Sequence, residues 1–226
     1  MTKTIGKILW IVAIIFMGLT AVMNLLGGTG TVCAAFLTEN YPSMLDIMDY
    51  RWLYQLLMIV TVVIGIANIW VLISLIRKRE KSYRNAIIIL VAGTIVAGIQ
   101  VYASLALRGK AVPANMKLYI NVITLVLFLI LRAPGIREWL NFTTPTTGTD
   151  EATAAGMASI VNGLVILTVF EWTGSSHTYM GENWVEVLQT PLLLGGGFLL
   201  LSGIGFLLRA LRGVLRHEGP EVTAKA

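Results

Sequence analysis

The chain contains few charged residues, and those few avoid its long apolar segments. Charged residues make up 13% of the 226 residues, whereas hydrophobic residues make up 56%; soluble domains average about 25% charged residues. A soluble fold of this size cannot bury so much apolar surface. No Asp, Glu, Lys, Arg or His lies in the middle of an apolar run, so the sequence lacks the signature of a proton relay, ion pathway or voltage sensor.

Cysteine and histidine are nearly absent. The single cysteine, Cys33, cannot form an internal disulfide, and no Cys or His cluster has the spacing of a zinc or iron–sulfur site. The two histidines, His177 and His217, fall in a connection and in the C-terminal tail, which excludes a haem held inside the bundle by two imidazoles of this chain. Phosphate-binding loops, nucleophile elbows and zinc-protease motifs are also missing. The sequence therefore assigns no metal and leaves any cofactor unknown.

Six apolar runs predict an all-α, polytopic integral membrane helix bundle. A hydrocarbon layer about 30 Å thick takes roughly 20 apolar residues per helix. The predicted transmembrane helices cover about 8–27, 52–76, 86–107, 117–132, 154–172 and 188–208. In the fourth, Lys117 and Arg132 are expected to extend their stems toward the membrane surfaces. Residues 1–218 are predicted to form one transmembrane domain, and 219–226 are predicted to form a flexible tail.

The basic residues predict the orientation of this bundle. All but four of the 17 lysines and arginines fall on the side of the N-terminus, the exceptions being Arg51, Arg108, Lys110 and Lys117. Because cytoplasmic connections are enriched in Lys and Arg, both termini are predicted to be cytoplasmic, in a prokaryotic plasma (inner) membrane. The basic residues flank the spans and form no patch with interleaved aromatics, so no nucleic-acid partner is expected.

Two outer connections, 28–51 and 171–187, contain the candidate binding residues. In the first, Pro42 predicts the start of a short helix along the membrane interface that caps the bundle. The second reads EWTGSSHTYMGENWVEV, and its tryptophans suit an aromatic belt. Arg108 and Lys110, from the remaining outer connection, can pair with its carboxylates. We call these residues the outer cluster: Glu171, Trp172, His177, Glu182, Trp184, Glu186, Arg108 and Lys110. The alternative is a solvated loop with ordinary ion pairs.

Small and amide side chains predict how the helices pack. Small residues recur at four-residue spacing in Ala155, Ser159 and Gly163 and again in Gly93 and Ala97. The last predicted helix contains glycines at 195–197, 203 and 205, where no side chain extends from the backbone. Such faces allow close helix contact in lipid. Five amides within apolar runs are expected to face the bundle interior: Asn24, Asn68, Gln100, Asn121 and Asn162. On the inner side, 133–153 is predicted to be a surface loop, with a short amphipathic helix at IREWLNF.

Three functions are compatible with these features. The absence of catalytic motifs favours a non-catalytic membrane subunit or accessory protein, with connections 28–51 and 171–187 as a docking surface for protein partners in the membrane or on its outer face. The buried amides would also permit a small transporter or channel for a neutral or apolar solute. The third possibility is a membrane enzyme or quinone-binding protein that uses the outer cluster, in which His177 is expected to meet a protein, a metal or a quinone head outside the chain.

Overall fold

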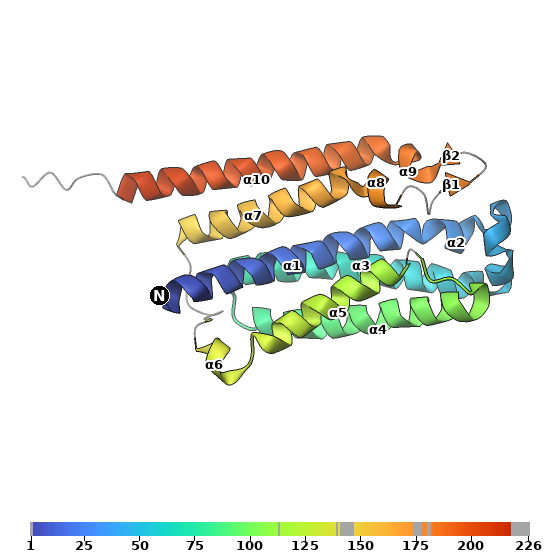
Figure 1. The fold of residues 1–226 in the computed structure, drawn as a ribbon, viewed down its shortest axis with the longest axis horizontal. Helices are drawn as coiled ribbons and strands as arrows, with labels where there is room; N and C mark the ends of the chain where they lie inside the picture. Colours follow the sequence, from blue (N-terminus) through green and yellow to red (C-terminus); the bar gives the residue numbers. More distant parts are fainter. Residues whose placement is uncertain are drawn as a thin grey trace, which may run out of the picture.

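The computed structural model of the chain describes residues 2–112, 114–138, 140, 147–173, 178–179 and 182–217, and these are almost entirely helical (Figure 1). The predicted tail at 219–226 lies outside this range. The long helices are α1 (Thr2–Gly30), α3 (Arg51–Ile76), α4 (Ser82–Arg108), α5 (Ala114–Ile130), α7 (Gly148–Leu167) and α10 (Gln189–His217). The short elements are α2 (Val32–Phe36), η1 (Thr38–Asn40), η2 (Pro42–Tyr50), α6 (Pro134–Arg137), α8 (Val169–Thr173) and α9 (Trp184–Val187), together with β1 (Thr178–Tyr179) and β2 (Glu182–Asn183), which pair antiparallel.

Four helical segments are long and apolar enough to cross a membrane. They cover Thr4–Phe36, Met44–Ile76, Ser82–Arg108 and Gln189–Leu215, and α5 is a shorter apolar helix. Each of the six predicted runs coincides with a helix or, for 154–172, with the consecutive helices α7 and α8. The structure thus confirms an all-helical architecture compatible with a membrane location, while the count of six spans and the orientation stay predictions.

The helix α1 occupies the middle of the bundle. It packs against α3, α5 and α7, whereas α4 joins α3 and α5 on one side and α10 packs along α7 on the other (Figure 1). Residues near the N-terminus of α1 belong to an apolar core cluster that includes Trp10, Ile14, Met17, Leu75, Leu90 and Phe128. The opposite end of the bundle carries α2, η2, α8 and the start of α10, and we call it the α2 end.

Glycines bring α7 and α10 into close contact. A Cβ added to Gly163 would lie 2.8 Å from the carbonyl oxygen of Gly196, and one added to Gly156 would lie 3.0 Å from that of Gly203. The two helices therefore meet through glycines spaced seven residues apart. Of the predicted small-residue face of Ala155, Ser159 and Gly163, only Gly163 takes part in these glycine contacts. Among the glycines predicted to allow close packing of the last helix, those at 195, 197 and 205 have open space beside them.

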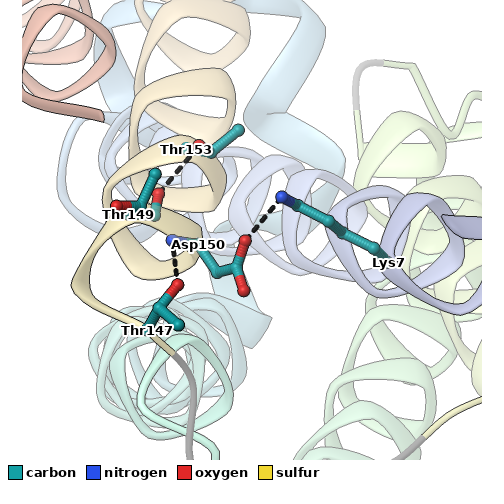
Figure 2. A network of polar contacts seen from close by, with 5 residues as sticks. All are labelled: Lys7, Thr147, Thr149, Asp150 and Thr153. Atoms are coloured by element: carbon teal, nitrogen blue, oxygen red, sulfur yellow. Dashed lines mark hydrogen bonds and ion pairs between the residues drawn. The ribbon is translucent and has the colours of Figure 1, made fainter. Parts of the chain in front are cut away.

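The start of α7 is held on α1 by a small polar network (Figure 2). Thr147 Oγ1 accepts a hydrogen bond from the backbone N–H of Asp150 at 3.2 Å, and Asp150 pairs with Lys7 of α1 at 2.5 Å. Thr147 thus acts as the N-cap of α7. The prediction of a surface loop over 133–153 is wrong at its end, because this cap starts the helix at Gly148.

Two short helices predicted in the connections have counterparts in the structure. Pro42 does begin a helical segment, but η2 is a 3₁₀ helix; it packs on α3 and α4 and buries Ile47. The helix predicted at IREWLNF shares its first two residues with α6, which spans Pro134–Arg137, whereas its residues 139, 141 and 142 lie outside the described part of the chain. Ile136 and Leu140 pack on the apolar core cluster, so this connection is anchored by its apolar side chains.

Candidate functional site

A cavity of about 510 Å³ lies at the α2 end. Its walls come from the end of α1, from α2 and η2, from α4 and the start of α5, and from α8, α9 and the start of α10. The cavity therefore separates the bundle formed by α1, α3, α4 and α5 from the end of the α7–α10 pair. Its volume falls within the range of about 300–1,000 Å³ that is usual for small-molecule sites.

Most of the lining is apolar, and five of its polar residues come from α3, α4 and α5; we call them the polar wall: Tyr54, Gln100, Ser104, Arg108 and Lys117. Gln100, Ser104 and Arg108 line the cavity from α4 at four-residue intervals, so they share one face of that helix. Tyr54 and Ser104 place their hydroxyl oxygens 3.2 Å apart. The apolar lining includes Met23, Leu26, Val32, Met44, Leu188 and Leu192. An apolar chamber with a few convergent polar groups is typical of a ligand site.

Lys117, in the first turn of α5, reaches the cavity from inside the bundle. Its side chain is 2% exposed, and its ammonium group donates to Thr61 Oγ1 at 3.1 Å and to Gln100 Oε1. The expectation that Lys117 extends toward the membrane surface is wrong. The physical reason is that α3 and α4 offer it acceptors inside the bundle, where an ammonium group without partners would be costly.

Gly27 of α1 leaves space for the side chain of Lys117. A Cβ at position 27 would lie 3.0 Å from Lys117 Cδ. The stem of Lys117 therefore passes over the backbone of α1 where no side chain stands in the way.

Lys117 lies at one end of a buried network of polar side chains, which we call the polar column: Gln100, Thr31, Asn121, Asn24, Thr20 and Thr124. Gln100 Nε2 donates to Thr31 Oγ1 at 3.0 Å, and Thr31 donates to the carbonyl oxygen of Gly27 at 2.6 Å. Along α5, Asn121 donates to the carbonyl oxygen of Lys117 at 2.7 Å and exchanges two hydrogen bonds with Asn24 of α1, at 3.0 and 3.3 Å. One turn further, Thr20 donates to Thr124 at 2.8 Å. Lys117, Asn121 and Thr124 thus share the face of α5 that packs on α1.

The polar column ends within the bundle. Beyond Thr20 and Thr124, the neighbouring residues on these two helices are Met17 and Phe128, which belong to the apolar core cluster and are fully buried. Among the described residues, the cavity is therefore polar toward the inside of the bundle, and the apolar core cluster separates the cavity from the other end of the bundle.

All five amides predicted to face the interior are buried. Asn24, Gln100 and Asn121 belong to the network around Lys117, while Asn162 donates to the carbonyl oxygen of Ala158 at 2.7 Å. The two side-chain polar atoms of Asn68 have no hydrogen-bond partner among the described residues. The prediction of buried amides is confirmed, and three of the five converge on one site.

The outer cluster is only partly described. Arg108 and Trp172 line the cavity, whereas Glu171, Glu186 and Lys110 are exposed. His177 lies outside the described residues, as do the side chains of Glu182 and Trp184. The expected ion pair across the outer face and the role of His177 therefore stay predictions, while Lys117 bonds to Thr61 and Gln100 instead of an outer carboxylate. Within the described part of the chain, no group of three His, Cys, Asp or Glu residues could hold a metal ion.

Sequence reasoning missed Lys117 as a site residue, although a signal was present. Lys117, Asn121 and Thr124 are spaced by four and three residues, which places them on one helical face, and a polar stripe of this kind in an apolar helix indicates an inward face.

Comparison of the chain with protein families, with curated proteins and with solved structures gives no match.

Proposed function

We propose that the chain is a six-span integral membrane protein of a prokaryotic plasma membrane that binds a small amphipathic molecule in the cavity at the α2 end. The single observation that carries this proposal is the cavity of about 510 Å³, which is apolar over most of its lining and contains the polar wall from α3, α4 and α5. A ligand with an apolar body and one polar end would match both parts of that lining. No catalytic step is included in the proposal.

The distribution of basic residues supports an outward-facing cavity. Arg77, Lys78 and Arg79 follow α3, and Arg209 and Arg212 lie late in α10, at the end of the bundle opposite α2 (Figure 1). If that end is cytoplasmic, as the enrichment of Lys and Arg in cytoplasmic connections suggests, both termini are inside and the α2 end faces outward. The ligand would then enter from the outer leaflet or from outside the cell.

The packing of the opposite end favours binding over continuous conduction. Trp10, Ile14, Met17 and Phe128 fill the bundle beyond the polar column. A channel for a neutral solute would require this core to open. A binding site that is reached from one end requires no such rearrangement.

A membrane-subunit role is the second candidate, and one observation favours it. Connection 28–51 is helical and packed on the bundle, and η2 buries Ile47 while it exposes Leu45, Met48 and Tyr50. A preformed surface of this kind would bind a partner at low ordering cost. Purification of the chain in mild detergent tests this candidate: a dedicated subunit would emerge with stoichiometric partners, and a chain that is purified alone from its native membrane speaks against it.

Cys33 offers a direct test of ligand binding, because it is the only cysteine of the chain and lines the cavity. The purified protein would be placed in lipid nanodiscs, and alkylation of Cys33 by N-ethylmaleimide would be followed by intact-mass measurement with and without n-decanol. We expect decanol to slow the alkylation. In Ala111→Trp, which places an indole in the lining, decanol should no longer slow it, whereas the control Ala106→Trp, at an exposed position of α4, should behave like the wild type. If neither decanol nor a charged amphiphile of ten carbons slows the alkylation of the wild type, ligand binding is contradicted.

A further inference from the structure

We propose that the ligand of this cavity carries an oxyanion head, a carboxylate or a phosphate ester, which binds the ammonium group of Lys117. This inference rests on the proposed binding function and specifies the chemical class of the ligand. It follows from the charge of the lining, from the direction of the hydrogen bonds around Lys117 and from the apolar remainder of the cavity.

The charge of Lys117 has no acidic neighbour in the lining. Lys117 belongs to the lining, and among the described residues no Asp or Glu does. The two acceptors of Lys117, Thr61 and Gln100, are neutral. A neutral acceptor satisfies a proton but leaves the positive charge without a counterion, and a buried charge of this kind is costly. An anion in the cavity would supply the missing counterion.

The ammonium group of Lys117 begins a chain of hydrogen bonds in which each side chain donates to the next. Lys117 donates to Gln100, Gln100 donates to Thr31, and Thr31 donates to the backbone carbonyl oxygen of Gly27. The amide of Gln100 is thereby oriented with its oxygen toward Lys117. An ammonium group has three protons, and the described residues accept two of them. The remaining proton needs an acceptor, and an oxyanion would form a charge-assisted hydrogen bond there.

The neighbouring hydroxyls strengthen this preference. Tyr54 and Ser104 share one hydrogen bond, so one of their two protons remains available to a ligand acceptor. Beyond this polar wall, the lining is formed by side chains such as Met23, Leu26 and Leu192. A free inorganic anion would leave that apolar part unfilled, whereas an anion with an alkyl tail would occupy both parts.

The alkylation of Cys33 in nanodiscs of zwitterionic lipid also tests the charge of the head. Four ligands with ten carbon atoms are compared, namely decanoate, decyl phosphate, decanol and decylamine, with inorganic phosphate as a fifth. We expect decanoate and decyl phosphate to slow the alkylation at concentrations about tenfold lower than decanol, because a hydrogen bond to a charged group is stronger than a neutral one. Decylamine should be weaker than decanol, and inorganic phosphate alone should have no effect. If phosphatidylglycerol in the disc protects Cys33 without added ligand, the anion is a lipid headgroup; if only the single-chain anions do, it is a free amphiphile.

Two variants tie the preference to Lys117. Lys117→Gln removes the charge, and Gln100→Glu supplies an internal carboxylate of the same shape beside Lys117. Both should reduce the preference for anions over decanol to near unity, and Gln100→Glu tests the assignment even if Lys117→Gln fails to fold. The control Lys110→Gln, which removes an exposed charge at the same end, should keep the preference.

Equal protection by all alkyl ligands, or an unchanged preference in Gln100→Glu, would overturn the anion assignment while the binding function stands. Protection by no ligand would overturn the binding function itself, and equal effects of inorganic phosphate and decyl phosphate would overturn the requirement for a tail.

Discussion

Lys117 of α5 passes over Gly27 of α1 so closely that a Cβ on the glycine would lie 3.0 Å from Lys117 Cδ and 3.6 Å from Lys117 Cβ. The absence of a side chain at position 27 is therefore part of what allows the lysine to reach Thr61 and Gln100 inside the bundle. A larger residue there would displace the lysine stem and, with it, the ammonium group at the cavity wall.

Gly27→Val should destabilise the protein and weaken its preference for anionic ligands. We expect a loss of about 1–3 kcal/mol in the free energy of unfolding, the usual cost of overpacking, measured by denaturant unfolding in detergent. The control is Gly98→Ala in α4, where an added Cβ meets no atom within 4 Å; it should be neutral or stabilising by up to about 1 kcal/mol. Equal behaviour of the two variants would contradict the close passage of Lys117.

The glycine contacts between α7 and α10 predict a second ranking. Gly163→Leu should lower the melting temperature far more than Leu164→Ala, because Gly163 touches the backbone of α10 while Leu164 is 48% exposed. Gly195→Leu, at a position with open space beside it, is the matched control and should resemble the wild type. A reversed order of Gly163→Leu and Leu164→Ala would show that this interface is wrong.

Asn24 and Asn121 should be energetically coupled. Each single replacement by leucine leaves the other amide without its side-chain partner, so we expect each to cost about 1 kcal/mol, as for other interhelical hydrogen bonds in membranes. The double variant should cost clearly less than the sum of the two. Strict additivity in this double-mutant cycle would indicate that the hydrogen-bonded pair contributes no coupling.

The network at the start of α7 predicts two different salt responses. Asp150→Asn should cost less than about 1 kcal/mol, because the side chains of Lys7 and Asp150 are 46% and 30% exposed. This cost should shrink as salt is added. Thr147→Ala should cost about 1 kcal/mol through loss of the N-cap, with little dependence on salt. Parallel unfolding curves in low and high salt would separate the two effects.

The proposed orientation can be tested with cysteines at exposed positions of the described chain. In a Cys33→Ala background, Lys110→Cys and Glu186→Cys should react with an impermeant maleimide on intact cells, because both lie at the α2 end. Glu80→Cys and Glu138→Cys, at the opposite end, should react only after the cells are opened. Labelling of Glu138→Cys on intact cells would contradict the six-span arrangement.

The long helices could be located from the sequence because each coincides with an apolar run. Their ends were less predictable: α1 and α10 extend to Thr2 and His217, beyond the predicted 8–27 and 188–208. Apolar runs mark the part of a helix that suits hydrocarbon, whereas helical hydrogen bonding continues through polar residues such as Arg209 and Arg212. Similarly, Thr147 starts α7 within a segment whose composition is typical of a loop.

The candidate site was only half predictable for a related reason. Amides inside apolar runs must face the protein, so the burial of Asn24, Gln100 and Asn121 follows from local composition. The location of Lys117 depends instead on acceptors from α3 and α4 and on a glycine of α1. The position of Lys117 near the start of its helix led to the wrong prediction that its side chain extends toward the membrane surface, because contacts between helices decide the direction of the side chain.

The most direct measurement is native mass spectrometry of the protein taken gently from its own membrane, with identification of whatever remains bound. We expect a retained amphiphile with a carboxylate or phosphate head on the wild type and on Lys110→Gln, and its loss from Gln100→Glu, in which Lys117 already has a counterion. A wild-type protein that retains only neutral or cationic molecules, or a Gln100→Glu variant that keeps the same anionic ligand, would contradict the assignment of Lys117 as the group that binds the head.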